Sequence, residues 1–237
     1  MTATATKWTP TKASKAGLIS VGVLAVLIVL MALSTYTTAS LDGLAADEEQ
    51  TIARVYAGAP AIIQAFFYLH IAGGTVALAI GPFQFSQRLR NRFTRSHRAA
   101  GRVYLTAVWL GALAGLVVAP YNSAGAIGVA GFGSLAILWF ITGIAAYRAA
   151  RERRLDSHRA WMIRNFALTF AGVTLRLWVT ALLTIYADAT GADTVTAFER
   201  AYVLVPFLSW VPNLLVAEWL VRRRGLPAFH LVRRPAS

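Results

Sequence analysis

The sequence predicts an all-α protein, a polytopic membrane bundle of six transmembrane helices with both termini on the cytoplasmic side. Hydrophobic residues make up 57% of the 237 residues and charged residues only 14%, which is too apolar for an ordinary soluble domain. Long uncharged runs recur, and each can be divided into segments that would cross a bilayer. The basic residues gather in short connectors between these runs.

Charge and cysteine content exclude several classes of function. The net charge of +13 does not indicate a nucleic-acid partner, because no soluble basic domain carries it. Cysteine is absent, which excludes disulfides, thiolate metal sites and haem attached through cysteine pairs. We therefore expect a multi-pass protein of a cell membrane whose first partner is the lipid bilayer.

The first span is expected at about residues 16–37, after a short cytoplasmic tail, residues 1–15, that carries three lysines. The apolar run is longer than the core of a signal peptide, about 7–15 residues, so an uncleaved span is favoured over a cleaved leader. An acidic loop follows, made of Asp42, Asp47, Glu48 and Glu49.

The second span is expected at about residues 61–83, with His70 near its middle and small residues on the same face. Such residues let another helix, or a flat ligand, approach closely. Residues 103–147 carry no charge and are too long for one crossing. A turn signal at residues 120–125 divides them into a third span, 103–119, and a fourth, 126–147.

The fifth span is expected at about residues 161–186 and the sixth at about 201–221, bent by Pro206 and Pro212. A basic cytoplasmic tail, residues 222–237, ends the single membrane domain. With the amino terminus inside, all Lys and Arg except Arg54, Arg176 and Arg200 lie on the cytoplasmic side, as the positive-inside rule requires.

A polar stripe runs along the fifth span. At about 100° per residue its members lie near one line, and they are His158, Asn165, Thr169, Gly172 and Arg176. The start of the third span matches it weakly, with the line His97, Tyr104, Val108, Gly111 and Gly115. A polar stripe on an apolar helix should face protein or an internal cavity rather than lipid.

The histidines allow two interpretations. His97 and His158 lie at matched ends of two parallel spans, where neutral imidazoles could be the axial ligands of one b-type haem. Alternatively, these His-Arg pairs at the membrane surface contact lipid phosphates. Both interpretations stay open, as does any enzymatic activity.

His70 and Arg176 are expected at similar depth, facing one interior space. His70 would be a haem ligand or proton carrier, and Arg176 the counter-ion of an acidic or lipid-like ligand. The alternatives are structural: His70 would be a hydrogen-bonded core histidine, and Arg176 would extend its side chain to the membrane surface. Gly115 is expected to leave room for the guanidinium. Gln84, Tyr104 and Asn165 complete the set of candidate ligand contacts.

The combination of motifs resembles a prokaryotic family of predicted membrane proteins, domain of unknown function 2306. The motifs are His70 with Gly73-Gly74, Gly81-Pro82-Phe83-Gln84-Phe85, His97-Arg98 with Gly101-Arg102 and Tyr104, the run from His158 to Asn165, and Thr174-Leu175-Arg176. The resemblance covers about residues 60–220 and implies a multi-span bacterial membrane protein. The histidine layout is also loosely similar to two-haem membrane cytochromes of the b561 type, which implies haem b. The fourth span has no histidine, unlike that pattern. An anionic lipid or a quinone is a further expected partner.

Overall fold

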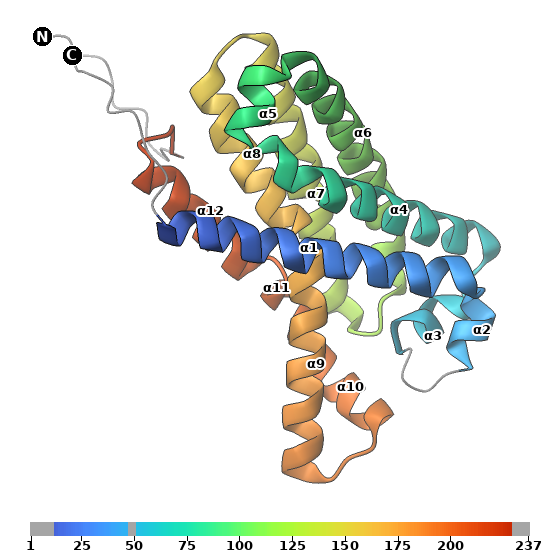
Figure 1. Ribbon diagram of the computed structural model, residues 1–237. Helices are drawn as coiled ribbons and strands as arrows, with labels where there is room; N and C mark the ends of the chain where they lie inside the picture. The colour runs from blue at the N-terminus through green and yellow to red at the C-terminus, as the bar shows by residue number, and fades with distance from the viewer. Residues whose placement is uncertain (1–11, 47–50, 229–237) are drawn as a thin grey trace, which may run out of the picture.

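The computed structural model describes residues 12–46 and 51–228, and all its regular elements within them are helices (Figure 1). In chain order these are α1 (Lys12–Thr38), α2 (Leu41–Ala45), α3 (Thr51–Ala57), α4 (Ala61–Gln84), α5 (Gln87–Arg92), α6 (Thr94–Val118), η1 (Ala119–Tyr121), α7 (Gly125–Arg151), α8 (Leu155–Thr169), α9 (Ala171–Thr190), α10 (Thr194–Tyr202), α11 (Val205–Leu208) and α12 (Val211–Arg223). Asp47, Glu48 and Glu49 of the expected acidic loop, and the tail beyond residue 228, lie outside the described residues.

The predicted class is confirmed. Among the described residues, five helical stretches are long and apolar enough to cross a membrane, and a bent pair, Thr194–Tyr202 and Val205–Arg223, makes a sixth candidate. The protein is thus a multi-pass helical membrane protein, and its cytoplasmic termini stay a prediction.

The largest differences from the expected boundaries concern the third, fifth and sixth spans. The third begins at Thr94, so His97 lies in the first turn of a continuous helix instead of a connector. The fifth is two consecutive helices that meet at Phe170. The sixth bends by 63° between α10 and α11–α12. Pro206 and Pro212 lie in the first turns of α11 and α12, where a missing N–H costs least. Each follows a break in the sixth span, and Pro206 directly follows the 63° bend, as expected for a residue that cannot continue the preceding helix.

The centre of the bundle is formed by α4, α6, α7 and α8, because small residues let these helices pack closely. A Cβ on Gly73 would lie 2.7 Å from the carbonyl oxygen of Ala107 and 2.8 Å from the Cα of Gly111, so α4 and α6 touch through backbone. Gly81 leaves room for the ring of Phe166. The small residues of the second span therefore pack against another helix, α6, which is one of the two expectations; the other was a flat ligand.

The outer helices complete the arrangement. α1 lies alongside α4, and α10 packs against α9 where that helix extends beyond the central bundle (Figure 1). Most large apolar side chains of α1 are exposed, among them Ile19, Val23 and Leu30, which suits a helix in contact with lipid. The buried polar residues lie on the central helices, except for Ser209 between α11 and α12.

Candidate functional site

A buried hydrogen-bond network joins α6, α7 and α8 at the middle of the bundle. The Tyr104 hydroxyl donates to Oδ1 of Asn165 at 2.7 Å and lies 2.9 Å from the Thr169 hydroxyl. Asn165 Nδ2 donates to the Trp139 carbonyl at 2.9 Å and to the Thr142 hydroxyl at 2.8 Å. The stripe of the fifth span thus faces protein at this level. The polar groups of Tyr104 and Asn165 form hydrogen bonds with neighbouring helices.

This network fixes the register of α6 against α8. Because α6, α7 and α8 follow one another up and down the bundle, α6 and α8 run in the same direction (Figure 1). His97 and His158 each lie seven residues, about two turns, before the bonded pair Tyr104 and Asn165. The two histidines therefore lie at one level, and they interact electrostatically. We call this level, where α6 and α8 begin, the basic end of the bundle.

The imidazole of His158 is oriented by α7. Its Nδ1 lies 2.9 Å from the carbonyl oxygen of Ala146. A carbonyl oxygen only accepts, so Nδ1 carries the hydrogen and Nε2 of the neutral ring keeps its lone pair. His158 thus has the tautomer that a metal ligand through Nε2 requires.

Two buried polar atoms at the same end have no hydrogen-bond partner among the described residues, namely Nδ1 of His97 and Nε2 of Gln84. Gln84 is only 7% exposed. A Cβ on Gly101, one turn after His97, would lie 3.3 Å from Oε1 of Gln84, which places this amide beside the start of α6. Buried polar groups are normally paired, so unpaired ones mark a place for water, an ion or a ligand. We call His97, His158 and Gln84 the basic-end cluster.

Positive charge surrounds the basic-end cluster. Arg90 of α5 and Arg98 interact electrostatically with His97. Partial burial, and then the positive charge of Arg159, lower the pKa of Arg90 below its ordinary value. Asp156 pairs with Arg159 at 3.1 Å, but both side chains are exposed. The crowding of guanidinium groups favours an anionic ligand here.

His70 and Arg176 lie farther along the bundle. Nδ1 of His70 is 2.8 Å from the carbonyl oxygen of Gly111, and its ring meets that of Trp139 edge-on. A Cβ on Gly115 would lie 2.8 Å from the same Nδ1. Gly115 therefore makes room for the imidazole, and the expectation that it accommodates the guanidinium of Arg176 is wrong.

The guanidinium of Arg176 has no carboxylate partner among the described residues. Its Nη1 donates to the carbonyl oxygen of Gly172, one turn back on the same helix, at 2.7 Å. The phenols of Tyr36 and Tyr202 interact with it electrostatically, and so does His70. No hydrogen bond between described residues joins Arg176 to His70, and a single interior space shared by the two side chains stays a prediction.

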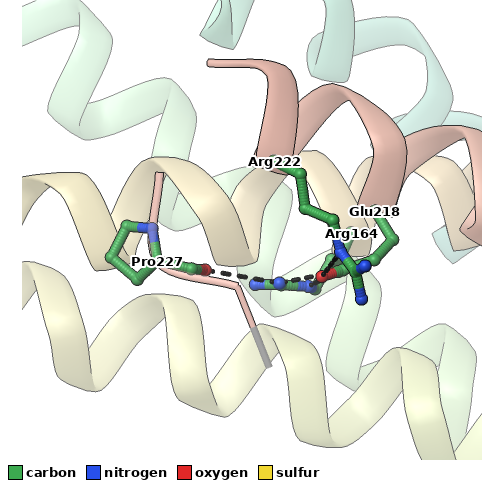
Figure 2. Close-up of polar contacts among 4 residues, drawn as sticks. All are labelled: Arg164, Glu218, Arg222 and Pro227. Carbon is green, nitrogen blue, oxygen red and sulfur yellow. Dashed lines mark hydrogen bonds and ion pairs between the residues drawn. The ribbon is translucent and has the colours of Figure 1, made fainter. Parts of the chain in front are cut away.

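An ion pair that sequence reasoning missed ties α12 to α8 (Figure 2). Nε and Nη2 of Arg164 both donate to Oε2 of Glu218, at 2.9 and 2.7 Å. Arg222 approaches Oε1 of the same carboxylate at 3.4 Å, and Nη2 of Arg164 also donates to the Pro227 carbonyl (Figure 2). Glu218 is an acid inside an apolar run, which by itself indicates a buried basic partner.

No cluster of three or more His, Asp or Glu side chains suited to a metal ion occurs within residues 12–46 and 51–228. Two histidines are enough for haem, whose porphyrin supplies the other four ligands. The family model described as "Predicted membrane protein (DUF2306)" matches residues 67–221. No curated protein and no solved structure shows a significant match.

Proposed function

The chain belongs to the DUF2306 family of predicted membrane proteins, and from that premise we propose that it binds one b-type haem and transfers electrons in the membrane. The observation that carries the proposal is the matched level of His97 and His158 on two parallel helices, set by the Tyr104–Asn165 bond. A membrane quinone is the redox partner that we propose for such a site.

The donor chemistry of the basic-end cluster fits this group. His97 and His158 would hold the iron through imidazole nitrogens. The bond from His158 to the Ala146 carbonyl orients that ring and raises its basicity, as backbone carbonyls do for metal-bound histidines. Arg90 and Arg159 supply positive charge for the two propionates. When bound, haem supplies one-electron chemistry, and the protein's part is to orient it and to exclude water.

Difference spectra test this proposal. Protein purified in detergent from haem-replete cells should give a sharp α-band of the b type when reduced-minus-oxidised spectra are recorded. His97→Ala and His158→Ala should each abolish the band, because each removes one of the two imidazoles that would hold the iron. His70→Gln, at a histidine outside the cluster, should keep it.

Gel filtration shows whether each variant stays folded. A wild-type protein without the band would overturn the proposal. A band that survives in a folded double variant, His97→Ala with His158→Ala, would place the haem elsewhere.

A second candidate function rests on Arg176, whose half-buried guanidinium has aromatic neighbours and no carboxylate partner among the described residues. The protein would then bind or carry a small acidic or lipid-like molecule, since a buried cation without a counter-ion is costly in a membrane.

Native mass spectrometry of the purified protein tests this second candidate. Wild type should retain an acidic small molecule, and Arg176→Gln should lose most of it, because the neutral amide cannot offset a carboxylate or phosphate charge. Arg200→Gln, at an exposed arginine of α10, should behave like wild type. Equal retention in wild type and Arg176→Gln would show that Arg176 is not the anchor.

A further inference from the structure

An apolar groove of about 410 Å³ lies between α4 and α6, and none of the histidines lines it. Its walls are Leu69 and Val76 on α4 and Val103 and Leu110 on α6, all of which are exposed. From residue 102 to residue 110 it follows α6 for about 12 Å, the rise of eight residues. The groove therefore has the length of part of an acyl chain.

The shape of the groove follows from the contact that holds α4 to α6. Gly73 and Ala107 both line it. At Gly73 the helices touch through backbone, since a Cβ there would meet the Ala107 carbonyl oxygen at 2.7 Å. No side chain of α4 can fill the groove at this point, so its depth is built into the fold.

Along the side of α6 that lines the groove, the side chains change from charged to polar to apolar. Arg98, Arg102, Thr106 and Leu110 follow at intervals of four residues, so they lie along one side of the helix. Reading away from the basic end, the side chains are two guanidinium groups, then a hydroxyl, then an apolar group. A phospholipid has the same order, with its phosphate, its glycerol esters and its acyl chain.

The polar groups of this series lack protein partners. Arg102 and Thr106 are exposed, and neither makes a hydrogen bond or ion pair to any described residue. The sequence contains no acidic residue from position 50 to position 151, so no carboxylate of this segment can neutralise the arginines. An unpaired hydroxyl facing hydrocarbon is unfavourable, and a lipid ester would satisfy it.

We propose that this groove is a binding site for an anionic phospholipid of the leaflet at the basic end. One acyl chain lies in the groove over Gly73 and Ala107. Arg102 and Arg98 bind the phosphate, and the Thr106 hydroxyl donates to an ester carbonyl. The proposal does not depend on haem, because none of these groups belongs to the basic-end cluster.

Lipid titration monitored by native mass spectrometry tests the proposal. Delipidated wild-type protein should bind its first dioleoyl phosphatidylglycerol at least about fivefold more tightly than dioleoyl phosphatidylcholine, the factor expected for one arginine at an anionic headgroup. Arg102→Gln should lose this preference. Arg148→Gln, which removes an exposed arginine from α7, should keep it.

Two further measurements separate the groove from simple charge attraction. Thr106→Trp places an indole in the groove and should weaken the first binding event for both lipids. Glycerophosphoglycerol, the headgroup without chains, should fail to displace the bound lipid. Equal affinity of wild type for both lipids, an unchanged preference in Arg102→Gln, or displacement by the headgroup alone would each overturn the proposal. Thermal unfolding in detergent confirms that the variants are folded.

Discussion

Glu218→Gln should lower the free energy of unfolding by about 3–5 kcal/mol, the range for breaking one partner out of a buried ion pair. The side chain of Arg164 is 3% exposed and that of Glu218 21%, so loss of the carboxylate removes a bidentate negative partner from a guanidinium inside the bundle. The Trp161 ring, whose centroid lies 5.0 Å from Cζ of Arg164, and the Pro227 carbonyl carry no negative charge that could replace the carboxylate. Unfolding in detergent with increasing dodecyl sulfate measures the change.

The chain offers a matched control and a local probe for this variant. Glu152→Gln removes an exposed partner of Arg154 and should cost at most about 1 kcal/mol. Because the chain has no cysteine, a single Val221→Cys can report on α12, where Val221 is fully buried. Its maleimide labelling should accelerate in the Glu218→Gln background. If Glu218→Gln and Glu152→Gln cost the same, the buried pair does not hold α12 in place.

Gly73→Ala should destabilise the protein by about 1–3 kcal/mol, the usual cost of forcing extra atoms into a packed core. The added methyl would lie within 3 Å of the Ala107 carbonyl oxygen and of the Gly111 Cα, and backbone atoms cannot turn aside as a flexible side chain can. α4 and α6 would have to separate along their contact. The same dodecyl sulfate titration measures the loss.

Gly74→Ala is the control, one residue away on the same helix. A Cβ at Gly74 meets nothing within 4 Å, so only helix propensity changes, which favours alanine by up to about 1 kcal/mol. The two neighbouring substitutions should therefore have effects of opposite sign. A Gly73→Ala protein as stable as Gly74→Ala would contradict the backbone contact between α4 and α6.

Helical periodicity predicted the parts of the site that depend on one helix at a time. The polar stripe of the fifth span faces protein, with Asn165 and Thr169 in the central network. The weak repeat between the third and fifth spans aligned Tyr104 with Asn165 and His97 with His158, and the Tyr104–Asn165 bond shows that α6 and α8 pack in this register. Because the two helices are parallel and the paired residues have the same spacing, one bonded pair places the other pair at the same level.

Contacts between helices distant in the sequence could not be predicted in the same way. Arg164 is next to Asn165 in the chain but points about 100° away from the stripe, and its partner lies 54 residues later. To predict that pair, one would have to know the bend between α10 and α12, because this bend sets the position of Glu218. The alignment of the third span with the fifth likewise assigned Gly115 to Arg176, whereas packing gives that space to His70.

The electron paramagnetic resonance spectrum of the oxidised protein, purified with its native cofactor content, tests the central claim most directly. Our account predicts a low-spin ferric signal of a haem with two imidazole ligands, at one haem per chain. In His97→Ala and His158→Ala that signal should be lost or replaced by a high-spin one, because one axial position of the iron then lacks its imidazole. A wild-type protein that contains no haem, or a low-spin signal that is unchanged in both variants, would contradict it.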